Sequence, residues 1–429
     1  MKCPFSLPCG WILRPVWQEF DVTLGKMIQS EPTEDAPIGY PYHKAASVQD
    51  GVLLDPFEKM FASEIGAAKL GVRKGDLLVC EGGDIGRSAI VSDEPDQLTI
   101  IQNSVHRVRS KGRYPVEYLK LVLDAYRHNG WLDVFIGKNT IAHFTAETFN
   151  NLLIPLPNPQ YANKAVEIYQ FEAKAIEDLL SYMESKLNKL SEYRQSLITQ
   201  AVTRGLDPNV EMKDSGVPWV GMIPYHWKCG KIKYFASISA GGTPDRTVKD
   251  YWNNGTIPWI KTGELLNDDI VSVEECITPL ALRKSAAKLF PEGTVLVAMY
   301  GQGKTRGMAG MLTWPATTNQ ACACICPKNS LLLGKFLLRL MESSYAFNRE
   351  KAAGTGQPNL NQDIIANLLI PIPPLDEQMK IINHLDVSLK HIQHMKGTID
   401  GAINKLQEYR SSLITAVVTG KIDINEVNR

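Results

Sequence analysis

Two stretches of the chain carry an apolar residue at every seventh position. The first runs from Tyr169 to Leu197 and the second from Leu385 to Leu413. An apolar period of seven is typical of helices that pair along a coiled-coil seam. The alternative is that each helix packs only on its own globular part. A seam of this length, in matching register on both helices, favours pairing. The predicted seam consists of these residues: Ile176, Met183, Leu190, Leu197, Ile392, Ile399, Leu406 and Leu413.

The two stretches belong to a longer internal repeat. NKLSEYRQSLITQAVT (188–203) and NKLQEYRSSLITAVVT (404–419) are identical at 12 of 16 positions, and their offset is 404 − 188 = 216. The same offset aligns NLLIPLP (151–157) with NLLIPIP (367–373). We therefore predict a tandem duplication of a unit of about 215 residues. Repeats that pair through equivalent surfaces are related by a pseudo-twofold axis, so the two helices should run antiparallel.

The rest of each repeat is rich in Gly, Pro and short apolar runs. DLLVC (76–80), TIPWIKTG (256–263) and TVLVAMY (294–300) are typical of short strands separated by loops. The predicted fold is therefore α+β: a mixed α/β domain followed by a long helix, present twice, with the two helices paired as an antiparallel coiled coil. The predicted boundaries place domains at 1–157 and 208–373, and helices at 158–207 and 374–429, the last with a C-terminal tail.

Charge and composition exclude several classes of protein. The 429 residues include 46 basic and 46 acidic ones, so any nucleic-acid surface must come from local clustering of charge. No apolar run is long enough for a membrane span, and the proline-rich start does not resemble a signal peptide. The eight cysteines form no regular framework. We expect a cytoplasmic protein with reduced thiols.

One motif resembles a phosphate-binding loop. AMYGQGKT (298–305) follows an apolar strand and places Lys304 and Thr305 as such a loop requires. The mechanism also needs a helix after the loop, whose N-terminus holds the phosphate. The following RGMAGMLTWPATTNQ contains Gly307, Gly310 and Pro315, which oppose a helix. A glycine-rich turn between two strands is the favoured interpretation.

Two further motifs have simpler explanations. NPQY (158–161) resembles the NPPY motif of adenine methyltransferases, but no glycine-rich cofactor loop precedes it, so we interpret it as a strand-to-helix junction. CACIC (322–326) puts three cysteines on one face of a strand. Zinc sites usually show two pairs with longer spacing and a nearby His, so buried strand cysteines are favoured over a metal site.

Cations alternate with other residues at Arg107, Arg109, Lys111 and Arg113. If the strand continues through all four, they share one face without an intervening acid. Such a stripe could contact DNA phosphates. The alternative is a solvated strand edge.

Several strings, in order and repeated around two helices, resemble the specificity (S) subunit of type I restriction-modification systems, HsdS. They are SGVPWVGMIPYHWK (215–228), GGTP (241–244), IPWIKTGEL (257–265), Asn319-Gln320 and IPIPPLDEQ (370–378). The resemblance covers essentially the whole chain. The first repeat departs from it, with PNPQYA (157–162) in place of PPLDEQ (373–378) and PCGW in place of PYHW.

The resemblance implies a function without chemistry in this chain. Each globular part would be a target-recognition domain that reads one half of a split, asymmetric sequence in double-stranded DNA. The helices would set the spacer and dock two modification subunits, which carry S-adenosylmethionine and methylate adenine. Two restriction subunits that use ATP and Mg can join for cleavage. We expect no catalytic residue, no metal and no cofactor in this chain.

Side chains on loops that could reach bases or phosphates are the candidate DNA contacts, since Arg or Lys suits guanine and Gln suits adenine. In the first domain they are Arg87, Arg107, Arg109, Lys111, Arg113 and Lys138. In the second they are Lys261, Tyr300, Gln302, Lys304, Arg306 and Gln357. Two other functions stay open: a coiled-coil scaffold that does not read DNA, and an enzyme that binds a nucleotide through residues 298–305.

Overall fold

The computed structural model describes residues 4–136, 144–301, 303–328, 330–353 and 359–422. The chain divides into two compact units. Unit 1 comprises Met1–Glu184 and Asp400–Arg429, and unit 2 comprises Ser185–Ile399. The two long helices, α5 (Pro159–Arg204) and α11 (Leu375–Val418), each contribute to both units. Their bounds fall inside the predicted helical ranges. The predicted division into four domains stays a prediction.

The described residues of unit 1 form three small sheets. The largest is antiparallel, in the order β2-β8-β5-β6, with β2 at Phe20–Leu24, β8 at Val105–Ser110, β5 at Leu77–Cys80 and β6 at Ser88–Ile90. The second has the order β4-β3-β7, with β4 at Lys59–Ala62, β3 at Ile38–His43 and β7 at Ile100–Ile101. The third pairs β1 (Ile12–Pro15) with β9 (Leu153–Leu156). Its short helices are α1 (Glu64–Leu70), α2 (Val116–His128), α3 (Trp131–Ile136) and α4 (Ala146–Asn150).

Unit 2 repeats this order of strands and adds three strands, β10, β11 and β15, within its described residues. Its largest sheet is β13-β20-β17-β18-β15, with β13 at Ala236–Ala240, β20 at Cys322–Pro327, β17 at Val295–Ala298, β18 at Ala309–Leu312 and β15 at Asp268–Ile270. The next is β16-β14-β19, with β16 at Glu275–Ile277, β14 at Ile257–Ile260 and β19 at Thr317–Thr318. Two antiparallel pairs join β12 (Lys228–Lys231) to β21 (Leu369–Ile372) and β10 (Met212–Asp214) to β11 (Met222–Pro224). The helices are α6 (Ile232–Phe235), α7 (Pro279–Lys284), α8 (Gly334–Ser343), α9 (Tyr345–Ala353) and α10 (Gln362–Ala366). Mixed helix and strand content confirms the α+β class.

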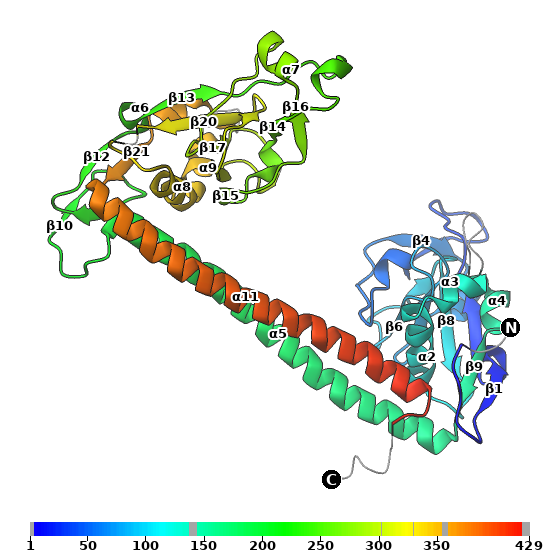
Figure 1. The fold of residues 1–429 in the computed structure, drawn as a ribbon. Coiled ribbons are helices and arrows are strands. Elements are labelled where there is room, and N and C mark those ends of the chain that lie inside the picture. The colour runs from blue at the N-terminus through cyan, green and yellow to red at the C-terminus, as the bar shows by residue number, and fades with distance from the viewer. Residues whose placement is uncertain (1–3, 137–143, 302, 329, 354–358, 423–429) are drawn as a thin grey trace. The chain divides into compact units, whose positions relative to one another are not determined.

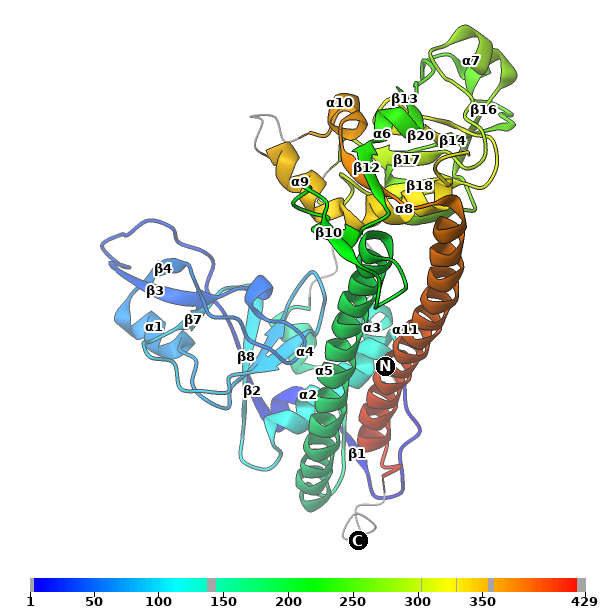
Figure 2. The same cartoon turned by 90° about the vertical axis from the view of Figure 1, so that its left-hand side faces the viewer.

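Each unit has a core between its largest sheet and one helix. In unit 1, α2 lies against β5, β6 and β8, and Leu77 and Val79 pack with Leu119 and Val122. In unit 2, α8 lies against β17, β18 and β20 in the same way (Figure 1 and Figure 2). Burial of apolar area is the main stabilising contribution in both.

The long helices extend these cores. In unit 1, Val166 near the start of α5 packs in one cluster with Val417 near the end of α11. In unit 2, Ile198 near the end of α5 packs with Ile381 near the start of α11. Within each unit the start of one helix therefore meets the end of the other. The residues of the predicted seam are all buried or half-buried.

A glycine with positive φ follows each long helix. Gly205, with φ 76°, lies against the ring of Trp227 in unit 2. Gly420, with φ 70°, lies against the ring of Trp11 in unit 1. A side chain at either position would be strained by the backbone conformation and would meet the indole ring. The two helix ends are therefore docked in the same way.

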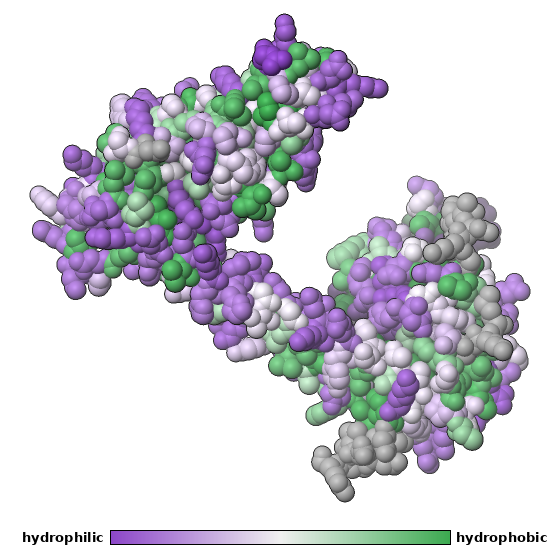
Figure 3. All heavy atoms as spheres, in the orientation of Figure 1, coloured by the Kyte–Doolittle hydropathy of each residue, from purple (hydrophilic) through white to green (hydrophobic). Residues whose placement is uncertain are grey.

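The surface is mixed in polarity. In the view of Figure 3, hydrophobic residues form small groups among hydrophilic ones. Among the described residues, none of the helices has the length and apolar character needed to cross a membrane.

Candidate nucleic-acid interface

The largest sheet of each unit contains a hairpin whose loop is partly exposed. In unit 2, β17 and β18 pair antiparallel and are joined by residues 299–308. In unit 1, β5 and β6 are joined by residues 81–87. The motif that resembles a phosphate-binding loop (298–305) begins at the last residue of β17 and continues into residues 299–305, and a strand rather than a helix follows it. The glycine-rich turn between strands is thus confirmed, and the helix N-terminus that a bound phosphate would need is absent from this described segment.

The predicted residues of the unit 2 loop differ in exposure. Tyr300 is 44% exposed, Lys304 is exposed, and Arg306 is half-buried. Gln302 and Gln357 lie outside the described residues. Of the twelve candidates, Tyr300 and Lys304 therefore combine exposure with a place on a hairpin loop.

Lys261 is held by acidic neighbours. Its Nζ lies 2.7 Å from an oxygen of Glu274 and 3.0 Å from one of Glu275. The hydrogen bonds to Glu274 and Glu275 raise the pKa of Lys261 well above its usual value. Glu275 also pairs with Arg246, whose guanidinium stacks 3.7 Å from the ring centroid of Trp252. A cation that is already paired with two carboxylates attracts a DNA phosphate less strongly.

The prediction that four cations of unit 1 share one face of a strand is wrong. Strand β8 ends at Ser110, so Lys111 and Arg113 do not continue its face. It is also an inner strand, between β2 and β5, rather than an edge. Arg107 is 7% exposed, and it donates to the carbonyl oxygens of Lys69 and Gly71 at 2.9 and 2.6 Å. Burial is the main cause that lowers the pKa of Arg107.

Acidic side chains from other parts of unit 1 pair with the remaining cations. Arg109 binds Asp76 through Nε and Nη2, at 2.6 and 2.8 Å, and this hydrogen bonding raises the pKa of Arg109. Lys111 lies 3.4 Å from Asp21, and Arg113 lies 3.6 Å from Glu19. Arg87 donates to the carbonyl oxygen of Ala45 at 2.8 Å, and Lys138 lies outside the described residues.

Sequence reasoning missed the residues that hold the unit 2 loop. Tyr345 Oη donates to the carbonyl oxygen of Lys304 at 2.7 Å. Arg349 Nη1 lies 2.9 Å from the carbonyl oxygen of Gly303 and 3.1 Å from that of Arg306. Both side chains come from α9, about 40 residues further along the chain. No local sequence signal links them to the loop.

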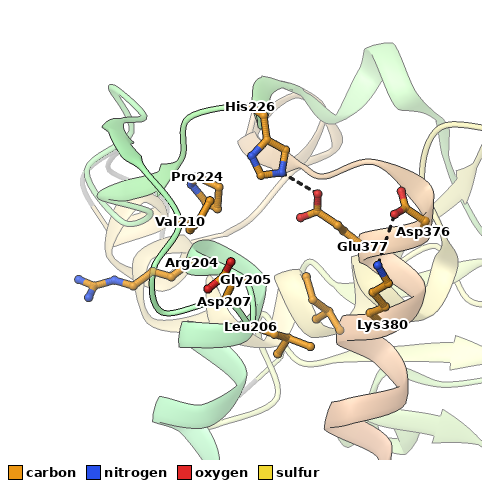
Figure 4. A pocket seen from close by; sticks show the side chains of 11 residues that line it. Arg204, Gly205, Leu206, Asp207, Val210, Pro224, His226, Asp376, Glu377 and Lys380 are labelled. Carbon is orange, nitrogen blue, oxygen red and sulfur yellow. Dashed lines mark hydrogen bonds and ion pairs between the residues drawn. The ribbon is translucent and has the colours of Figure 1, made fainter.

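A pocket in unit 2 lies where α5 ends and α11 begins (Figure 4). At its rim Glu377 accepts a hydrogen bond from Trp227 Nε1 at 2.8 Å and pairs with His226 Nε2 at 2.6 Å. The next residue, Gln378, is fully buried and satisfies backbone groups of Leu331, Leu333 and Pro373. The DEQ end of the family-like string therefore has a structural role.

The corresponding place in unit 1 uses different chemistry. Tyr161 stands 216 positions before Glu377, and its ring meets that of Trp11 edge-on at 5.3 Å. Pro159 is the first residue of α5, and Asn158 accepts a hydrogen bond from the backbone of Gln160 at 2.9 Å. NPQY is thus a strand-to-helix junction, as expected.

The clustered cysteines lie in a buried, apolar part of unit 2. Cys322 and Cys324 are fully buried in β20, and Cys326 packs on the same apolar cluster. Burial raises the pKa of Cys322 to about 12, so its thiol stays protonated. In the part of the chain that the structure describes, no group of three or more His, Cys, Asp or Glu side chains could hold a metal ion.

Comparison with known proteins shows which family the chain resembles. Residues 224–404 match the family model of the type I restriction modification DNA specificity domain. This stretch is therefore similar to type I specificity subunits, and the resemblance predicted from the motifs is confirmed.

Individual relatives agree with this assignment. The type I restriction enzyme MjaIX specificity subunit of Methanocaldococcus jannaschii is 30% identical over 167 residues, which is 38% of each chain. The EcoR124I/EcoR124II specificity subunit of Escherichia coli is 25% identical over 237 residues, 54% of each chain. These matches span less than two thirds of either relative. The MjaVIII specificity subunit of M. jannaschii is 21% identical over 91% of this chain and 87% of its own.

Solved structures share the fold. A chain from a study of complex assembly and conformational transition of the type I R-M system has a TM-score of 0.74 at 15% identity, covering 98% of this chain and 100% of that one. The HsdS subunit from Thermoanaerobacter tengcongensis has a TM-score of 0.54 at 16% identity, covering 98% and 99%.

Proposed function

We propose that this chain is the DNA-sequence-specificity subunit of a type I restriction-modification complex, with each unit reading one half of a bipartite, asymmetric DNA site. One observation carries the proposal: the two units repeat the same order of strands, yet their exposed hairpin loops differ in length and sequence. A shared scaffold with divergent loops suits two readers of different base sequences, because loops on a rigid scaffold carry specificity.

The proposal includes a tandem duplication and a coiled coil. Three sheets correspond between the units: β2-β8-β5-β6 with β13-β20-β17-β18, β4-β3-β7 with β16-β14-β19, and β1-β9 with β12-β21. The offset of 216 and the burial of the seam residues support the same view. The antiparallel helices would set the spacer between the half-sites.

In this proposal the chain supplies no chemistry. Two modification subunits dock on the helices, bind S-adenosylmethionine and methylate adenine. Restriction subunits that use ATP and Mg join for cleavage. The overall charge of zero is compatible with DNA binding, since base contacts specify the sequence while phosphate contacts position the protein.

A domain exchange tests the proposal. Residues 215–366 are replaced by the equivalent stretch of a relative with a different target, and methylated adenines are mapped genome-wide with the modification subunit present. One half of the methylated sequence should change and the other should stay. A change in both halves contradicts separate readers. Methylation without sequence preference would favour a coiled-coil scaffold, and ATP hydrolysis by the purified chain that is lost in Lys304→Ala would favour a nucleotide-binding enzyme.

A further inference from the structure

Part of the loop 299–308 of unit 2 is held through its backbone. The carbonyl oxygens of Gly303, Lys304 and Arg306 all accept hydrogen bonds from α9. These three bonds restrain the backbone of residues 303–306, while the side chain of Lys304 stays exposed. These contacts restrain residues 303–306 without using the side chain of Lys304.

The two residues of α9 that make these contacts act as a pair. Arg349 Nη1 also donates to Tyr345 Oη at 3.0 Å, and its guanidinium lies 5.3 Å from the centroid of the Tyr345 ring. Their spacing of four places them on one face of the helix. The ring packs against Gly307, whose φ of 88° and close contact with Tyr345 both disfavour a side chain. The Tyr345–Arg349 pair therefore both bonds and packs against the loop.

The base of the same hairpin is fixed from the other side. Asn267, with φ 59°, donates its backbone N–H to the carbonyl oxygen of Ala309 at 2.7 Å. Its Oδ1 accepts the backbone N–H of Ala309 at 2.8 Å. Arg339, which is buried, donates to the carbonyl oxygen of Asn267 at 3.0 Å. Because the base is anchored separately, a change at Tyr345 or Arg349 should loosen the tip of the loop without unfolding the sheet.

Unit 1 holds its corresponding loop differently. Arg127 at the end of α2 lies 3.7 Å from Asp84 in the loop 81–87 and 2.5 Å from Asp50. This contact is to a side chain, whereas the carbonyl oxygens of Glu81 and Arg87 accept the backbone N–H groups of Phe144 and Cys80, each at 2.8 Å. The Tyr345–Arg349 pair is thus specific to unit 2.

We propose that Tyr345 and Arg349 are positioning residues for sequence recognition by unit 2: they hold the loop 299–308 in the shape that brings Tyr300 and Lys304 against the DNA of the second half-site, without contacting the bases themselves. The inference rests on the proposed function. Exposed tyrosine and lysine side chains on a fixed loop suit stacking and phosphate or guanine contacts.

The test uses the full chain in complex with its modification subunit. Tyr345→Phe removes the hydroxyl and keeps the ring, and Arg349→Gln removes the charged donor. Tyr234→Phe is the matched control, because this tyrosine of unit 2 is 60% exposed and its hydroxyl bonds to nothing in the described part of the chain. Binding to duplexes with the cognate site, or with either half-site altered, is measured at several salt concentrations.

A positioning role predicts a specific pattern. Tyr345→Phe and Arg349→Gln should each lose about 3- to 10-fold of the preference for the cognate second half-site, as the loss of one net hydrogen bond implies. The preference for the first half-site and the salt dependence should match those of the parent. Lys304→Ala, by contrast, should weaken binding and lower the salt slope by about one.

Each other outcome overturns the inference. Parental preference in both variants would show that the loop needs no support from α9. A lower salt slope in Arg349→Gln would make Arg349 a phosphate contact. If the parent complex itself prefers neither half-site, the proposed function fails and the inference with it. Should a variant bind too weakly to measure, hydrogen exchange decides: amides of residues 303–307 must exchange faster than in the Tyr234→Phe control, and equal rates contradict positioning.

Discussion

Replacement of Glu342 by glutamine should destabilise unit 2 strongly. The Glu342 side chain is 2% exposed and forms ion pairs with two arginines. One is Arg339, 5% exposed, whose Nη1 lies 2.9 Å from Glu342 Oε2. The other is Arg194 of α5, whose side chain is 32% exposed. Glutamine has nearly the same shape but no charge, so it leaves the buried arginine without its main counter-charge.

The size of this destabilisation depends on the interactions that the two arginines retain. Removal of one member of a buried ion pair typically costs about 3–5 kcal/mol. Arg339 keeps a contact of 3.2 Å to Asp268, and Arg194 can turn to solvent, so the lower end applies. A loss of about 3 kcal/mol in a unit of this size should lower the Tm by roughly 6–12 °C.

Thermal unfolding read by hydrogen exchange gives the assay, because peptides of unit 1 serve as an internal control in the same molecule. Peptides of unit 2 in Glu342→Gln should lose protection at lower temperature, while those of unit 1 should not. The double variant Arg339→Met with Glu342→Leu should recover most of the stability, since apolar side chains of similar volume replace such pairs well. Unfolding of Glu342→Gln within about 1 °C of the parent would refute the reasoning.

Three further predictions concern other parts of the chain. Burial lowers the pKa of His43 from 6.5 to about 4, so the stability that neutral His43 contributes to unit 1 is complete above pH 6.5 and is lost as the pH falls toward 4. In acid unfolding, the unfolding free energy of unit 1 should therefore fall by about 3 kcal/mol less in His43→Gln than in the parent. Leu190→Glu should weaken assembly with the modification subunit because a charge without a partner is placed at a half-buried seam position. The control Phe171→Glu should assemble normally, since Phe171 is 74% exposed, and equal assembly of the two variants would show that Leu190 does not belong to the seam. Duplication of residues 197–200 adds about 6 Å of helix and should lengthen the DNA spacer by about one to two base pairs, and an active variant with an unchanged spacer would contradict the helices as spacers.

Features with a local period were predictable from the sequence. The apolar repeats located α5 and α11, and the short apolar runs located β5, β14 and β17, because these patterns depend on residues close together in the chain. The expectation that a turn and a strand follow Lys304 rested on nearby Gly and Pro, which act locally as well.

Pairings between distant residues were not predictable. The alternating cations of unit 1 look free in the sequence, but Asp76 is 33 positions before Arg109 and Asp21 is 90 before Lys111. The same holds for Tyr345, 41 positions after Lys304. The sequence names side chains that could bind DNA, whereas the fold decides which of them are already bound to a neighbour.

The docking of Gly420 on Trp11 makes unit 1 dependent on the order of synthesis. Unit 2 is continuous in sequence, but the core of unit 1 includes Ile414, Val417 and Val418. A ribosome adds about 5–20 residues per second, so residue 414 follows residue 184 by roughly 10–50 s. During that time the growing chain exposes the apolar surface that these residues later cover. A chain that stops before residue 414 would therefore complete its second unit and leave its first one open.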